Sequence, residues 1–187
     1  MKILGSHHNT IIAGFVLLAV IVGIAAGTGG SVPSAMDFAR YAHVLAGIVW
    51  IGLLYYFNFV QVPSMPGFSA DSKAELFKEG SIVRRALCWF RFGALATLIL
   101  GLVLFAELGA GAGWDIRIGA AFGFIMWFNV TFIIWPNQKK VIGIDEATAD
   151  EKLAAGKKAL IASRINTLLS IPMLLLMFSS AHFPMFG

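Results

Sequence analysis

The sequence predicts an all-α membrane protein, a polytopic helix bundle with five transmembrane helices. Hydrophobic residues make up 58% of its 187 residues and charged residues only 13%. A soluble domain, by contrast, is about half apolar and about a quarter charged. The mean hydropathy of +0.81 agrees with a membrane protein. Five apolar stretches each approach the roughly 20 residues that a helix needs to cross a bilayer.

These stretches follow one another along the chain, and no loop between them is long enough to form a core of its own. We therefore treat residues 1–187 as a single transmembrane domain. The first stretch also has the apolar character of a signal-peptide core, but it is long for one and is predicted as a span. The predicted spans cover residues 10–27, 41–62, 86–106, 118–136 and 165–183, and only the third contains a charged residue, Arg91.

Lysine and arginine residues lie mostly on one side of the predicted membrane. The positive-inside rule places the N-terminus in the cytoplasm and the C-terminus in the periplasm of a bacterial inner membrane. Because the excess of 14 basic over 10 acidic residues serves topology, we expect no nucleic-acid partner. Of the lysines and arginines outside the spans, only Arg40 and Arg117 lie on the predicted periplasmic side. Eleven lie on the predicted cytoplasmic side: Lys2, Lys73, Lys78, Arg84, Arg85, Lys139, Lys140, Lys152, Lys157, Lys158 and Arg164.

Two histidines occur near the outer ends of their spans, His43 in the second and His182 in the fifth. Imidazoles from two helices of a bundle are a common ligand pair for haem iron, so this placement predicts a haem b site. Arg40 and Arg117 would meet the haem propionates. The macrocycle would be lined by Trp50, Met177, Phe178 and Phe183. Alternatively, each histidine is an interfacial hydrogen-bonding residue, or Met177 or a residue of a partner chain replaces His182 as the second ligand.

A second polar group lies in the inner halves of the spans, where uncharged polar residues are costly in lipid. One interpretation is a polar pocket, open to the cytoplasm, for a small anion or a quinone-like head group. In the other, Arg91 extends to the lipid headgroups and the cluster is structural. Its members are Asn58, Gln61, Arg91, Asn129, Arg164 and Asn166.

Four strings carry a resemblance to a known family: HVLAGIVWIGLLYYFNFVQVPSMP (43–66), ALCWFRFGALATLILG (86–101), IMWFNVTFIIWPNQKKVIGIDEAT (125–148) and ASRINTLLSIPMLLLM (162–177). They resemble the membrane domain of the bacterial cytochrome-c-linked urate oxidase (urate hydroxylase, PuuD-type) family. A fainter likeness, through His43, Trp50, Gly52, Leu53 and Tyr55, links the second span to HemJ-type haem-binding membrane proteins. The resemblance implies a membrane redox module with haem b that works with a cytochrome c. The family joins this domain to a C-terminal cytochrome c domain; the 187 residues contain no C-x-x-C-H motif, so we expect the cytochrome c to be a separate partner.

These observations support several functional hypotheses. The leading one is a haem-b-containing electron-transfer subunit that works with a cytochrome c or a larger membrane complex. The second is the membrane module of an oxidase of urate or a related small molecule. The third is a cofactor-free structural subunit of a respiratory or photosynthetic complex. A purine transporter fits least, because no inverted repeat and no broken pair of half-helices is present in the sequence.

Overall fold

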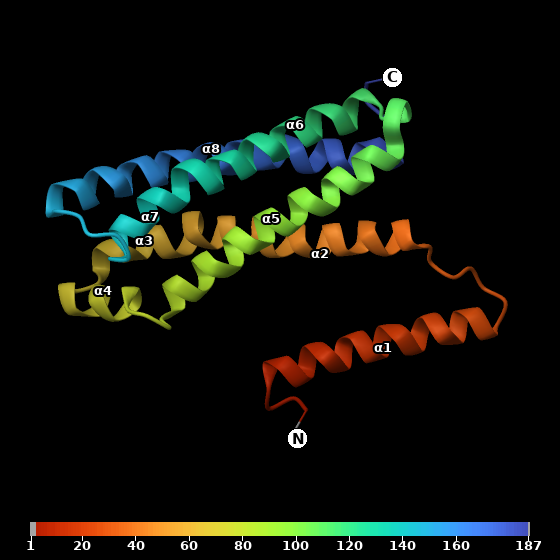
Figure 1. Cartoon of the computed structure of the whole chain (residues 1–187), viewed down its shortest axis with the longest axis horizontal. Coiled ribbons are helices and arrows are strands. Elements are labelled where there is room, and N and C mark those ends of the chain that lie inside the picture. Colours follow the sequence, from red (N-terminus) through yellow and green to blue (C-terminus); the bar gives the residue numbers. More distant parts are fainter. Residues whose placement is uncertain (1–2, 187) are drawn as a thin grey trace. The chain divides into compact units, whose positions relative to one another are not determined.

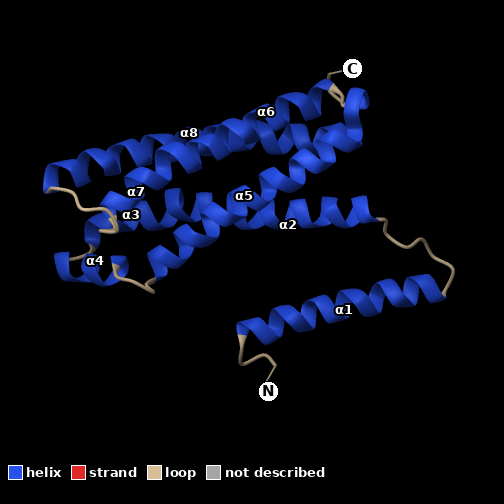
Figure 2. Ribbon diagram, viewed as in Figure 1, coloured by secondary structure: helices blue, strands red, loops and turns tan. Residues whose placement is uncertain are grey.

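The computed structural model describes residues 3–186, and all regular structure in that range is helical (Figure 2). Five helical segments in this range are long and apolar enough to cross a membrane, which confirms the all-α fold class and the five predicted transmembrane helices. The segments run His7–Gly27, Ala35–Gly67, Ile82–Gly111, Trp114–Val141 and Ala149–His182.

The observed helices extend beyond the predicted spans. The difference is largest for the fifth, α8 (Ala149–His182), which begins sixteen residues before the predicted span 165–183. A capping box starts this helix: Thr148 Oγ1 accepts the Glu151 N–H, and Glu151 Oε2 accepts the Thr148 N–H at 2.8 Å. Hydropathy detects the part of a helix that suits lipid, so it misses polar turns that continue the same helix.

The chain divides into two compact units, one up to Ala39 and the other from Arg40 onward. The single domain over residues 1–187 therefore stays a prediction. The first unit contains α1 (His7–Gly27), which buries no side chain and is apolar on every side after its polar first turn of His7, His8, Asn9 and Thr10. A helix that is apolar on every side suits a lipid environment.

A long helical rod begins at Ala35 and forms the start of the second unit from Arg40 onward. It comprises α2 (Ala35–Tyr56), the π-helical segment η1 (Phe57–Gln61), the short α3 (Val62–Ser64) and η2 (Met65–Gly67). After α4 (Ala70–Phe77), the long α5 (Ile82–Leu108) crosses α2 (Figure 1). The crossing is close because Gly93 has no side chain: a Cβ there would lie 3.3 Å from the Trp50 backbone nitrogen.

The remaining helices form a second layer. After η3 (Gly109–Gly111), α6 (Trp114–Phe128), the π-helical η4 (Asn129–Ile134) and α7 (Trp135–Val141) follow one another and run antiparallel to α8 (Figure 1). Gly119 and Gly123 bring α6 close to α8: a Cβ at Gly119 would lie 3.3 Å from Leu176 Cβ, and one at Gly123 would lie 3.6 Å from Met173 Sδ.

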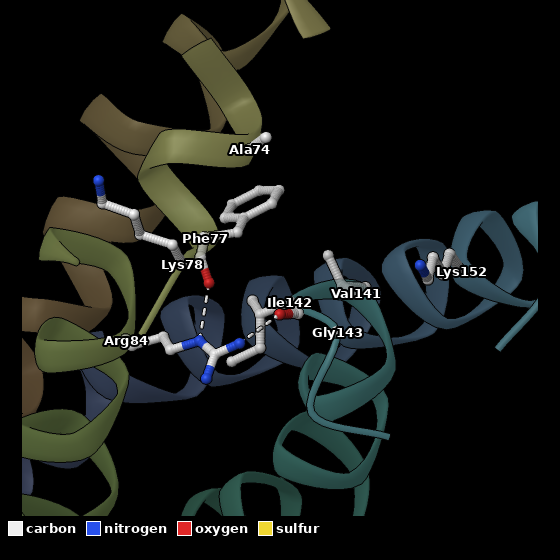
Figure 3. Close-up of a pocket in the computed structure, with 8 residues that line it drawn as sticks. All are labelled: Ala74, Phe77, Lys78, Arg84, Val141, Ile142, Gly143 and Lys152. Carbon is white, nitrogen blue, oxygen red and sulfur yellow. Dashed lines mark hydrogen bonds between the residues drawn. The ribbon is translucent and has the colours of Figure 1, made fainter. Parts of the chain in front are cut away.

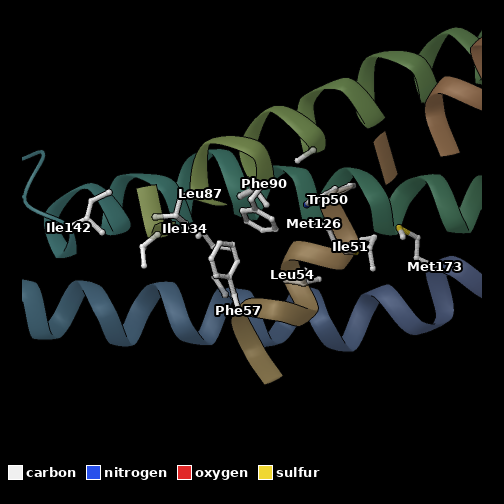
Figure 4. Packing of buried hydrophobic residues seen from close by; sticks show 14 residues of the cluster. Trp50, Ile51, Leu54, Phe57, Leu87, Phe90, Met126, Ile134, Ile142 and Met173 are labelled. Carbon is white, nitrogen blue, oxygen red and sulfur yellow. The ribbon is translucent and has the colours of Figure 1, made fainter. Parts of the chain in front are cut away.

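The core lies where these helices meet. Figure 4 shows side chains from α2, η1, α5, α6 and α8 converging there. Trp50, Leu54 and Met126 are at most 2% exposed. Phe57 meets Phe90 edge-on, with ring centroids 5.4 Å apart. This packing fixes the second span against the third and fourth, and so positions the polar residues described next.

Candidate functional site

His43 is held in place by α5. Its Nδ1 lies 2.9 Å from the backbone oxygen of Thr97, so the ring donates this hydrogen bond and Nε2 is left without its proton. Gly101 faces the ring: a Cβ there would lie 2.9 Å from His43 Cε1. A metal-binding histidine commonly donates its other nitrogen to a backbone carbonyl, which fixes the tautomer. The arrangement at His43 therefore leaves Nε2 as the ring nitrogen that would be available to a metal.

Trp50 lies on the same helix face as His43, two turns further along α2. It is 2% exposed, and its indole Nε1 has no hydrogen-bond acceptor among the described residues. A buried donor without an acceptor is costly, and such a group calls for a partner.

His182 lies at the end of α8 in a different environment. It is exposed, and its ring lies on Phe178 with centroids 4.3 Å apart. Phe183 also contacts Phe178, so three rings gather at this end of the helix. His43 is thus held by α5, whereas His182 contacts a side chain of its own helix. That the two histidines bind one haem as a pair stays a prediction. Within residues 3–186, no group of three or more His, Cys, Asp or Glu side chains forms a metal site.

The two arginines predicted to meet haem propionates are both exposed. Arg117 donates from Nε to the Ala112 carbonyl at 2.7 Å, and its guanidinium lies 5.8 Å from the centre of the Trp114 ring. Arg40 lies in the second turn of α2, three residues before His43. Their role toward a cofactor stays a prediction.

The inner polar residues meet along one face of α8, at Ser163, Asn166 and Ser170. Asn58 donates to Ser163 Oγ at 2.7 Å, and Asn129 donates to Asn166 Oδ1 at 2.8 Å. One turn further along, the Tyr55 hydroxyl lies 2.9 Å from Ser170 Oγ. We call these three pairs the α8 seam.

Both π-helical segments contribute to the α8 seam. Each has a backbone carbonyl three residues before it that accepts a hydrogen bond from a seam amide. Asn58 donates to the Leu54 carbonyl before η1, and Asn166 donates to the Met126 carbonyl before η4, both at 2.9 Å. A π-helical turn shifts the regular backbone hydrogen bonds and is frequent at functional sites, and side-chain amides here satisfy carbonyls next to the shift.

The other members of the predicted inner cluster lie apart from these pairs. Arg91 places its guanidinium 4.0 Å from the centre of the Trp135 ring, a cation–π contact. Arg164 is exposed. Gln61 is half-buried, and its Oε1 has no partner among the described residues.

Sequence reasoning missed three groups. The first is the Thr97 carbonyl that holds His43, which no side-chain pattern reveals. The second is Tyr55 with Ser163 and Ser170, which the spacing of polar residues on α8 could have revealed. The third is Asp115, only 1% exposed, which accepts from Ser179 Oγ at 2.6 Å and from the backbone of Met185 and Phe186.

Comparison with known proteins identifies the family. Residues 94–187, half of the chain, match the model of the urate oxidase N-terminal family. A comparison with curated proteins and with solved structures gives no match. The matched region contains Thr97, Gly101 and the α8 side of the seam, whereas His43 and Asn58 lie before it. The chain belongs to the urate oxidase N-terminal family.

Proposed function

We propose that this chain is a membrane redox module that carries haem b and passes electrons to a cytochrome c. The observation that supports it is the histidine held for ligation: His43 with Nδ1 on the Thr97 carbonyl and Nε2 free. The haem, when bound, supplies a one-electron iron couple. The chain's own residues hold the imidazole, exclude water through the core around Trp50, and offer Arg40 and Arg117 to the propionates.

An absorption spectrum of the purified full-length protein tests this proposal. We expect a Soret band that shifts on dithionite reduction and is lost in His43→Ala. His7→Ala is the matched control, because His7 lies in the first unit, and it should keep the band. A His43→Ala protein with full haem content would overturn the ligation. A colourless wild-type protein would favour the cofactor-free structural subunit.

The second candidate function is oxidation of urate or a related small molecule. The match to the urate oxidase N-terminal family is the observation that favours it. Such an oxidation releases two electrons, which would reduce two molecules of a separate cytochrome c. Membranes that contain the chain should then reduce added cytochrome c in the presence of urate. If the haem-loaded chain gives no urate-dependent reduction of cytochrome c, urate oxidation is excluded and the electron-transfer role remains.

The proposed location is a bacterial inner membrane with a cytoplasmic N-terminus and a periplasmic C-terminus. Five spanning helices put the two ends on opposite sides, and the basic residues favour this orientation. The outer end of α2 would then place His43 near the periplasm, where a soluble cytochrome c is found. The orientation therefore agrees with the proposed electron acceptor.

A further inference from the structure

A shallow cavity of about 280 Å³ lies in the second unit, and none of the residues that line it belongs to the His43 site (Figure 3). It lies where α4, the start of α5, the end of α7 and the start of α8 meet. None of its lining residues is acidic, and three are basic. The lining comprises Ala74, Phe77, Lys78, Arg84, Val141, Ile142, Gly143 and Lys152.

Arg84 is fixed by two backbone carbonyls in this lining. Its Nε donates to the Phe77 carbonyl at 2.7 Å, and one terminal nitrogen donates to the Ile142 carbonyl at 3.0 Å (Figure 3). The other terminal nitrogen makes no hydrogen bond to a described residue. A guanidinium that is already oriented loses little rotamer entropy when it binds an anion. Arg84 therefore joins α4 to the turn after α7 and still has donors to offer.

The two lysines in the lining differ in whether their ammonium group has a partner. Lys78 forms an ion pair with Glu75 on the same helix, so its charge is partly compensated. Lys152 forms no hydrogen bond or ion pair with a described side chain. The lining thus has an oriented guanidinium at Arg84 and, on the other side of Gly143, an ammonium at Lys152 (Figure 3), the two kinds of side-chain cation that bind phosphate oxygens.

The cavity also lies at the polar margin of the membrane. Arg84 is the third residue of the spanning segment Ile82–Gly111, and Val141 is the last residue of Trp114–Val141. Phe77 and Ile142 add apolar surface beside the cations. A site with both characters, at the ends of spanning helices, is suited to the head group of an anionic lipid.

We propose that this cavity binds a phosphate group through Arg84 and Lys152. The phosphate belongs either to the head group of an anionic phospholipid or to a free phosphate ion. The apolar wall favours the phospholipid, whose glycerol and upper acyl carbons would contact Phe77 and Ile142. The proposal does not depend on haem or on urate, because the site shares no residue with His43 or the α8 seam.

The test uses the full chain in a neutral detergent and follows its thermal unfolding. Phosphatidylglycerol, phosphatidylcholine and inorganic phosphate are titrated separately. We expect phosphatidylglycerol to raise the melting temperature, and Lys152→Glu to weaken this response by at least about fivefold in concentration, since a single basic residue near the surface gives about that factor. Lys157→Glu changes the charge equally on the same helix, outside the cavity lining, and should respond as the wild type does.

Each outcome decides a point. A response to phosphatidylglycerol alone assigns the phosphate to a lipid, and a response to inorganic phosphate as well assigns the site to the free ion. Equal responses of Lys152→Glu and Lys157→Glu, or no response of the wild type to either phosphate source, would overturn the proposal. If Lys152→Glu melts at a lower temperature without ligand, Lys152→Gln replaces it, with Lys157→Gln as its control.

Discussion

Replacing Asn166 with alanine should destabilise the second unit more than any other single change in the α8 seam. Asn166 is 0% exposed and joins two groups: it accepts from Asn129 at 2.8 Å and donates to the Met126 carbonyl at 2.9 Å. Its removal leaves one buried donor without a partner and one carbonyl with fewer donors. At about 1–3 kcal/mol for each unsatisfied group, the expected loss is about 3 kcal/mol.

Asn129→Ala should cost less, about 1.5 kcal/mol, because it leaves only Asn166 Oδ1 unpaired while the bond to Met126 persists. The double variant removes both partners together. Its cost should therefore fall below the sum of the single changes by about 1 kcal/mol, within the range of coupling energies measured between transmembrane helices.

The measurement is unfolding of the full chain by dodecyl sulfate in mixed micelles, followed by tryptophan fluorescence and circular dichroism. Thr167→Val is the control, since Thr167 is the next residue on α8 and its hydroxyl bonds only the Ser163 carbonyl of its own helix. It should change the unfolding free energy by less than about 0.5 kcal/mol. Additive costs of the two asparagine changes would refute the pairing that defines the seam.

Three further predictions follow from the same contacts. Gly101→Ala should displace the His43 ring and lower the ratio of Soret absorbance to protein. Gly52→Ala is the control: a Cβ there would have nothing within 4 Å, so it should keep the ratio and stabilise the protein by about 0.5–1 kcal/mol. Equal haem ratios in the two variants would contradict the contact between Gly101 and His43. Asp115→Asn should weaken the bonds to Ser179 and to the last residues by about 2 kcal/mol and speed hydrogen exchange at Met185 and Phe186; unchanged exchange would count against this anchor. Alkaline phosphatase should be active when fused to the C-terminus and inactive when fused to the N-terminus, and the reverse result would refute the proposed orientation.

Hydropathy was enough to predict five spans, because lipid requires each spanning helix to satisfy its own backbone. It located the centres of the spans better than their ends. The fifth span was predicted from residue 165, whereas α8 begins at Ala149. Residues 149–164 are helical but include several charged side chains. A search for apolar stretches does not detect a polar helical segment that continues a span.

The candidate site was predictable in part. Asn129 and Asn166 were placed at one depth by counting residues, and the structure joins them by a hydrogen bond. Hydropathy does not predict the π-helical turns; the Met126 carbonyl before η4, for example, accepts from Asn166, which lies 40 residues away in sequence. The Thr97 carbonyl at His43 was equally hidden, since a backbone acceptor has no residue signature.

The residues that the family model matches contact residues that precede the match. The matched region begins at Ala94, yet the groups it contains are arranged around side chains that precede it. Thr97 and Gly101 hold His43, and Ser163 and Ser170 bind Asn58 and Tyr55. The matched helices therefore contact the second span at two places: at His43 near its outer end, and at Tyr55 and Asn58 in its inner half. Because α2 and η1 form one continuous rod, a shift of the rod that loosens Asn58 from Ser163 would also move His43 against Gly101. Under the proposed haem ligation, the inner seam would therefore position the outer imidazole without contact to the iron.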